Sequence, residues 1–194
     1  MLEIRIHGRG GQGNVMAAYL LASTAIEEGR EAQAFPSFGA ERRGAPVTAF
    51  VRIADAPIRR RCQVQTPHFL IVQDPALLHV PGVTAGLREG GAILADGAPE
   101  PEFDAALGCP IVRLPATRLA VEHLGRPVPN TALMAAFLTL TGILPVDSLI
   151  KALGNRFKGD VFERNKRLIE AAAGQVPAGL WQDAMKEVSH ARGA

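Results

Sequence analysis

The residues whose spacing most clearly suggests chemistry are glycines near the start of the chain. Gly8, Gly10 and Gly13 satisfy the pattern G-x-G-x-x-G and follow a short segment of alternating apolar residues. Glycines allow a positive φ and close approach to the backbone, and the N-terminus of a following helix attracts phosphate. The pattern is typical of a dinucleotide-binding turn. The favoured alternatives are glycines that serve only turn and packing, or a shared anion or partner site.

The dinucleotide interpretation makes a further demand on the sequence. It requires an acidic residue at the end of the second strand, where the carboxylate holds the ribose hydroxyls. Here the expected second strand, residues 31–35, ends in Gln33, Ala34 and Phe35 and is followed by Pro36. A free-standing NAD(P)-dependent dehydrogenase therefore remains only as an alternative, which a nucleotide titration of the isolated chain would test.

A second set of chemically promising residues lies in the segment FPSFGAERRGAP, residues 35–46. Its adjacent Arg42 and Arg43 offer planar donors suited to phosphate or carboxylate, and Phe38 is placed to stack on a ring. Loops carry function more often than cores do. The alternative is a solvated basic loop in which Glu41 pairs with Arg43.

The remaining polar residues form no catalytic set. The run Arg59 to Arg61, read as extended strand, points to alternate faces, which favours a solvated face or salt bridges to another subunit. His7 stands alone before the glycines and is interpreted as a hydrogen-bonded neighbour. The two cysteines, Cys62 and Cys109, cannot supply the four thiolates of an iron–sulfur cluster. We therefore assign no catalytic residue and no metal site.

Composition narrows the class of protein further. The chain has 194 residues, a length suited to one domain, and a net charge of +2, which does not indicate a nucleic-acid or membrane-surface binder. Its first residues lack the apolar stretch of a signal peptide, so we expect a cytoplasmic protein. The longest apolar segment, residues 131–146, is interrupted by Gly142 and Pro145 and predicts a core helix instead of a membrane span.

The elements that must position these residues follow from periodicity. Leu2, Ile4 and Ile6 alternate with polar residues, which predicts a strand with one face against a core, and Asn14 is expected to cap the helix after the glycines. Further strands are expected at residues 31–35, 46–53, 69–72, 92–95 and 109–114, and helices from Pro115 onward. The sequence thus predicts one three-layer α/β domain over residues 1–194, with a mixed, largely parallel sheet, a Rossmann-like start and a helical C-terminal third.

Several motifs together resemble a known family. They are IRIHGRGGQG at residues 4–13, FPSFGAERRGAPV at 35–47, the dipeptide Asp74-Pro75 after an apolar strand, GRPVPNTALMAAF at 125–137 and NRFKGDVFERNKRLIEAA near the end. This set resembles the gamma subunit, or gamma domain, of the pyruvate/2-oxoacid:ferredoxin oxidoreductases. The resemblance covers nearly the whole chain.

The resemblance implies membership of a complex that oxidatively decarboxylates a 2-oxoacid and transfers the acyl group to coenzyme A. It implies alpha, beta and ferredoxin-like delta subunits as partners, with thiamine diphosphate, Mg and iron–sulfur clusters on those chains and no cofactor bound by this chain alone. It further implies that the chain helps to assemble the complex and enclose coenzyme A. By motif position, the candidate contacts are Gly10, Gly11, Gln12, Phe38, Glu41, Arg42 and Arg43. A purely structural clamp subunit is the second alternative.

Overall fold

The computed structural model describes residues 1–37 and 45–185. Within these residues the sheet has six strands, in the order β2-β3-β1-β4-β5-β6. Strands β1, β4, β5 and β6 run parallel, whereas β2 and β3 pair antiparallel at one side. The bounds of the strands are β1 Leu2–Arg9, β2 Glu31–Ser37, β3 Pro46–Ala54, β4 Phe69–Val72, β5 Ala92–Asp96 and β6 Ile111–Leu114. The predicted mixed, largely parallel sheet is confirmed.

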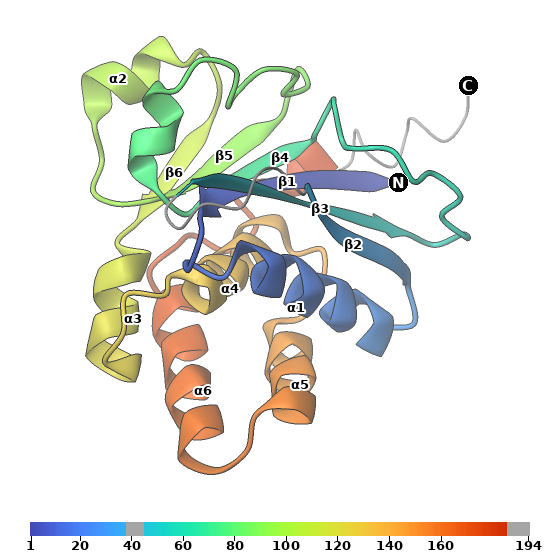
Figure 1. Ribbon diagram of the computed structural model, residues 1–194, viewed down its shortest axis with the longest axis vertical. Coiled ribbons are helices and arrows are strands. Elements are labelled where there is room, and N and C mark those ends of the chain that lie inside the picture. Colours follow the sequence, from blue (N-terminus) through green and yellow to red (C-terminus); the bar gives the residue numbers. More distant parts are fainter. Residues whose placement is uncertain (38–44, 186–194) are drawn as a thin grey trace.

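Helices cover the two faces of the sheet unequally (Figure 1). One face carries α1 (Asn14–Glu27), α3 (Ala116–Leu124), α4 (Asn130–Thr141), α5 (Val146–Arg156) and α6 (Gly159–Ala173). The other face carries the short 3-10 helix η1 (Pro75–His79) and α2 (Pro101–Ala106). A smaller apolar cluster lies between these helices and the sheet. The result is three layers with a helical C-terminal third, as the periodicity predicted.

The central helix α4 holds the larger core together. Nearly all of its side chains are buried, because it lies between the sheet and the outer helices α5 and α6. In α5 the expected apolar stripe is present: Leu149 and Leu153 are fully buried, while Val146 and Ile150 are half-buried. No helix among the described residues is long and apolar enough to cross a membrane.

The first strand differs from its prediction, because both of its faces are buried. Leu2, Ile4 and Ile6 face the helical core, as expected. On the other face, Glu3, Arg5 and His7 are also buried instead of meeting solvent. The reason is tertiary: the segment around Val83 to Arg88 folds over this face and supplies hydrogen-bond partners.

The start of α1 also differs from its prediction. The N-cap position is occupied by Gly13, with φ 82°, and Asn14 is the first helical residue. The Asn14 side chain donates instead to the carbonyl oxygen of Val47, at 2.7 Å. It lies against Gly8, where a Cβ would stand 2.2 Å from Asn14 Oδ1. Asn14 therefore joins the helix to β3 and does not cap it.

The arginine run at residues 59–61 is not a strand, because β3 ends at Ala54 and the chain then leaves the sheet. All three side chains belong to exposed residues on an irregular segment. The expectation that these arginines alternate between the faces of a strand was wrong. All three are solvent-exposed, which agrees with the alternative of a solvated segment.

Candidate functional site

The glycine loop lies at the carboxyl end of β1, beside the carboxyl end of β4. The two strands pair in parallel, and Gln73 N donates to the carbonyl oxygen of His7 at 2.7 Å just beyond the pairing. After β1 the chain passes to α1 on one face, and after β4 it passes to η1 on the other (Figure 1). In open α/β sheets such a divergence opens a crevice outside the strand ends, where ligands bind.

The glycines of this loop differ in how closely they are packed. A Cβ on Gly13 would lie 2.6 Å from Asn130 Nδ2, and Gly8 is similarly closed by Asn14, so both are required by internal packing. Gly11 has φ +99° and nothing within 4 Å of an added Cβ. Gly10 and Gly11 are also exposed. The packing interpretation therefore holds for Gly8 and Gly13, while Gly10 and Gly11 face outward.

Gln12 and Arg9 anchor the loop. Gln12 Oε1 accepts from Arg9 N at 2.7 Å, and Gln12 Nε2 lies 3.5 Å from the carbonyl oxygen of Gln73. The Arg9 side chain pairs with Asp74, whose other carboxylate oxygen accepts from Ala76 N and caps η1. The Asp-Pro dipeptide is thus tied directly to the glycine loop.

The residues that follow the arginine-containing segment lie beside the glycine loop. Gly10 N donates to the carbonyl oxygen of Ala45 at 3.1 Å, and Arg9 is the register partner of Pro46. The predicted contacts Phe38, Glu41, Arg42 and Arg43 lie outside the described residues. The chain on the carboxyl side of that segment is therefore brought beside Gly10, and the four side chains stay a prediction.

Two residues near the loop, Gln73 and Asn14, carry buried polar atoms whose lack of a hydrogen-bond partner was not predicted from the sequence. Both side-chain polar atoms of Gln73, which is fully buried, and Oδ1 of Asn14 have no hydrogen-bond partner in the described structure. Unsatisfied groups of this kind are uncommon in native proteins. A glutamine directly after a buried strand and before Asp74 was the only sequence signal for Gln73.

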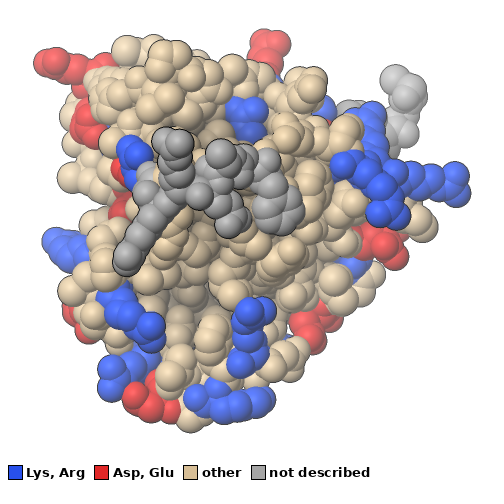
Figure 2. Space-filling view, in the orientation of Figure 1, with Lys and Arg blue, Asp and Glu red and all other residues tan. Residues whose placement is uncertain are grey.

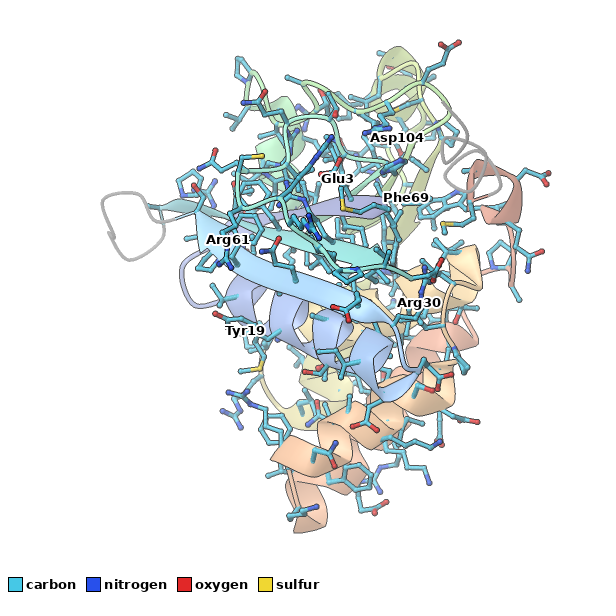
Figure 3. The ribbon with its side chains drawn as sticks, turned by 90° about the vertical axis from the view of Figure 1, so that its right-hand side faces the viewer. Glu3, Tyr19, Arg30, Arg61, Phe69 and Asp104 are labelled. Atoms are coloured by element: carbon cyan, nitrogen blue, oxygen red, sulfur yellow. The ribbon has the colours of Figure 1, made fainter. Side chains whose placement is uncertain are left out.

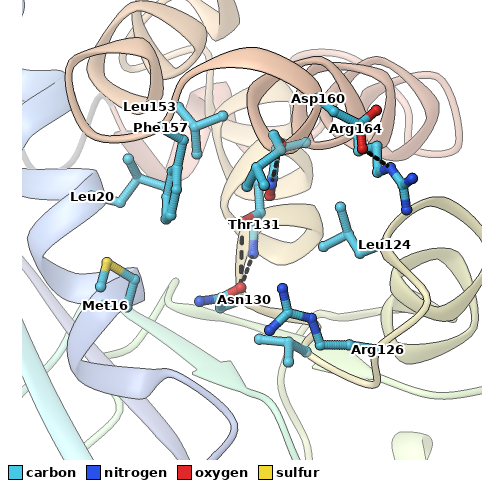
Figure 4. A pocket seen from close by; sticks show the side chains of 13 residues that line it. Met16, Leu20, Leu124, Arg126, Asn130, Thr131, Leu153, Phe157, Asp160 and Arg164 are labelled. Atoms are coloured by element: carbon cyan, nitrogen blue, oxygen red, sulfur yellow. Dashed lines mark hydrogen bonds and ion pairs between the residues drawn. The ribbon is translucent and has the colours of Figure 1, made fainter.

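The motif GRPVPN meets the glycine loop from the helical side. Asn130 Nδ2 lies 3.4 Å from the carbonyl oxygen of Gly13, so Asn130 separates the loop from a cavity of about 300 Å³ (Figure 4). The cavity is lined by residues of α1, α3, α4, α5 and α6 and of the α3–α4 connection, which carries Arg126; the α6 residues include an Asp160–Arg164 ion pair of 2.7 Å. Lys and Arg side chains gather around α5 and α6 on this face (Figure 2). The sequence did not reveal the cavity, because its walls come from separate segments.

Metal-binding residues do not cluster in the structure. Within residues 1–37 and 45–185, no group of three His, Cys, Asp or Glu side chains is placed to hold a metal ion. Cys62 is exposed, and Cys109 is half-buried, which raises the pKa of its thiol. Cys62 lies on an irregular segment, and Cys109 lies two residues before the start of β6 at Ile111.

The strand order departs from a dinucleotide-binding unit. The strand that follows α1 is β2, which lies at the sheet edge and pairs antiparallel with β3. The parallel neighbour of β1 is β4, and the acid that follows it, Asp74, is already paired with Arg9 and bonded to Ala76 N. The glycine fingerprint therefore lacks the strand arrangement that normally accompanies it.

The fold and the site define an α/β domain whose glycine loop faces outward at the carboxyl ends of the parallel strands of a mixed sheet. The family model described as pyruvate ferredoxin/flavodoxin oxidoreductase matches residues 3–175. The pyruvate synthase subunit PorC of Methanothermobacter marburgensis is 48% identical over 165 residues, covering 85% of this chain and 92% of the relative. The common gamma subunit of the pyruvate/ketoisovalerate oxidoreductases of Thermococcus kodakarensis is 45% identical, covering 89% and 95%.

A solved structure agrees. The crystal structure of pyruvate oxidoreductase subunit PORC from Thermotoga maritima has a TM-score of 0.80 and 36% identity, covering 89% of this chain and 95% of that chain. The chain belongs to the pyruvate ferredoxin/flavodoxin oxidoreductase family, and within it corresponds to the gamma subunit. The family resemblance read from the motifs is confirmed.

Proposed function

We propose that this gamma subunit assembles with alpha, beta and ferredoxin-like delta subunits and helps to enclose coenzyme A during CoA-acylating oxidative decarboxylation of a 2-oxoacid. Thiamine diphosphate with Mg, and the iron–sulfur clusters, belong in this proposal to the partner chains. When bound there, the thiamine cofactor supplies carbanion stabilisation. The names of the relatives, pyruvate synthase and pyruvate/ketoisovalerate oxidoreductase subunits, support the reaction class.

The observation that carries the coenzyme A proposal is the outward-facing glycine loop at the start of α1. Gly11 leaves room above its backbone, and the first turn of α1 contains no acidic residue that would repel an anion. Coenzyme A carries a pyrophosphate and a 3′-phosphate, and helix N-termini with open backbone N–H groups suit such groups.

The residues of this chain have binding and enclosing roles in the proposal. Gly10, Gly11 and Gln12 supply backbone surface, and Phe38, Glu41, Arg42 and Arg43 belong to the segment whose carboxyl end lies beside Gly10. Arg42 and Arg43 would hold phosphate oxygens by charge-assisted hydrogen bonds. Covering coenzyme A in this way would exclude water from the reacting acyl group. No proton transfer is assigned to this chain.

The test is to replace Arg42 or Arg43 with Ala in the assembled enzyme and measure steady-state kinetics. Hydrogen bonds to charged groups contribute about 1.5–3 kcal/mol, so the KM for coenzyme A should rise roughly tenfold to a hundredfold. The KM for the oxoacid and the rate of decarboxylation without coenzyme A should hardly change.

Arg59→Ala is the matched control, because Arg59 is an exposed arginine on an irregular segment. It should leave both constants as in the parent enzyme. If the constants for both substrates rise together in the Arg42 or Arg43 variants, or if the complex dissociates, the arginines hold subunits together. The chain would then act as a structural clamp, and the coenzyme A role would be rejected.

A further inference from the structure

Arg5 is a buried cation on β1 without a carboxylate partner among the described residues. It is 9% exposed, its Nε donates to His7 Nε2 at 2.9 Å, and its Nη2 donates to the carbonyl oxygens of Val83 and Ala85, each at 2.7 Å. The nearby carboxylate of Glu3 is already shared by Arg52, at 2.9 Å, and Arg88, at 3.3 Å. Burying a charge without a counter-charge is unfavourable, so this face of the sheet favours an added anion.

Arg5 lines an open cavity of about 370 Å³ over β1, β2 and β3. The floor includes Arg5, His7, Ser37 and Thr48, and the walls come from the segments around residues 63–65 and 82–86. A guanidinium has five N–H donors, of which one lies on Nε and two on Nη2. The two on Nη1 have no partner in the described structure, and Nη1 is not among its buried unsatisfied atoms. Nη1 is therefore not fully buried, and Arg5 is one of the residues that line the cavity.

Two hydroxyl groups add donors to the same cavity. Because His7 Nε2 accepts from Arg5, the ring proton is on Nδ1, which lies 3.5 Å from Thr48 Oγ1. Burial and the charge of Arg5 lower the pKa of His7 to about 4, so this neutral form persists at pH 7. Ser37 Oγ likewise accepts from Gln63 Nε2 at 3.0 Å. Each hydroxyl is thus used as an acceptor and retains its proton for donation.

We infer that this cavity binds a carboxylate group, with Arg5 Nη1 and the hydroxyls of Ser37 and Thr48 as donors. One cation with neutral donors matches the single charge of a carboxylate better than the higher charge of a phosphate monoester. The carboxylate belongs either to a small molecule or to an acidic side chain of a partner chain. The cavity lies over a face of the sheet, whereas the glycine loop lies at the carboxyl end of β1, so the inference does not depend on the coenzyme A proposal.

Acetate is the probe, and the readout is the denaturation midpoint of the full-length chain, with chloride keeping the ionic strength constant. A bound ligand stabilises the folded state in a saturable manner, which yields its dissociation constant. For so small a ligand we expect saturation in the millimolar range. Arg5→Gln should weaken acetate binding at least about tenfold, and Thr48→Val about three- to tenfold.

Thr48→Ser keeps the hydroxyl and should bind acetate as the parent does. Arg61→Gln removes the same charge from an exposed residue outside the cavity and should also match the parent (Figure 3). If Arg5→Gln does not fold, the difference in acetate affinity between Thr48→Val and Thr48→Ser tests the inference. Absence of saturable acetate binding, equal binding by both Thr48 variants, or tighter binding of inorganic phosphate overturns the inference.

Repeating the titration on the assembled complex identifies the source of the carboxylate. If acetate stabilises the isolated chain but has no saturable effect in the complex, a partner side chain occupies the cavity. If the effect persists in the complex, the site takes a small carboxylate. Both results support the site, and they separate its two uses.

Discussion

Arg9 and Asp74, 65 positions apart in the sequence, form an ion pair that fastens the glycine loop to the end of β4. The side chains are 38% and 17% exposed, so the pair should add only about 0.2–1 kcal/mol to stability. Its larger effect is to hold the loop in place. We predict that Asp74→Asn, which keeps an acceptor for Ala76 N, raises the KM for coenzyme A several-fold with little loss of stability.

The exposed pair of Arg30 and Asp55, joined at 2.9 Å near the other end of β3, provides the control. Asp55→Asn should cost a similarly small stability and leave the KM for coenzyme A unchanged. Denaturant unfolding of the chain and steady-state kinetics of the complex are the two measurements. Equal kinetics for the two variants would mean that the Arg9–Asp74 pair does not position a ligand site.

Comparing Gly11→Val with Gly29→Val distinguishes the effect of backbone strain from the effect of altering the outward-facing glycine loop. Gly11 and Gly29 both have positive φ, +99° and +71°, with nothing within 4 Å of an added Cβ. Each valine should therefore destabilise the chain through strain alone, by about 1–2 kcal/mol. Only Gly11→Val should also impair assembly or coenzyme A affinity, because Gly29 lies at the opposite end of α1. If Gly11→Val assembles and turns over as Gly29→Val does, the glycine loop is merely a turn.

The buried pair of Glu3 and Arg52 should matter far more for stability than a surface pair. The Arg52 side chain is 0% exposed and that of Glu3 is 4% exposed, and Arg52 Nε lies 2.9 Å from Glu3 Oε1. Glu3→Gln leaves Arg52 buried without its counter-charge and should cost about 3–5 kcal/mol of unfolding free energy. Asp160→Asn, which breaks the exposed i,i+4 pair with Arg164, should cost at most about 0.5 kcal/mol. Equal losses in chemical denaturation would contradict this account.

The buried histidines predict a pH dependence of stability. Burial is the main cause that lowers the pKa of both His7 and His68 to about 4, assisted by Arg5 and Arg88, respectively. Between about pH 4 and the unfolded value near 6.5, the unfolded chain binds more protons, so stability falls as the pH decreases through this window.

His7→Gln cannot titrate but keeps an acceptor for Arg5, so it should flatten this dependence. The slope removed is at most about 1.4 kcal/mol per pH unit. Unfolding free energies measured from pH 5 to 6.5 test the prediction, with the exposed His79→Gln as control, since the His79 side chain is 53% exposed. An unchanged slope in His7→Gln would show that His7 titrates normally in the folded chain.

Periodicity and turn residues predicted most of the elements. The strand at Phe69–Val72 has the predicted limits, and α5 buries Leu149 and Leu153 as expected. The motif set also identified the family. These features are local, because a strand or a helix repeats over a few residues and a motif is contiguous in the chain. The roles of Phe38, Glu41, Arg42 and Arg43 stay predictions, since those residues are outside the described structure.

Only the tertiary structure decided which polar residues are buried and which segments meet. Asn14 bonds to β3 instead of capping α1, Gln73 lies unpartnered beside the glycine loop, and Arg5 lies beneath a segment some 80 residues away in sequence. Alternation along β1 marked Arg5 as polar but did not show that its face is covered. Burial and charge balance depend on contacts between distant segments, and the spacing of residues along one segment carries no information about what packs against it.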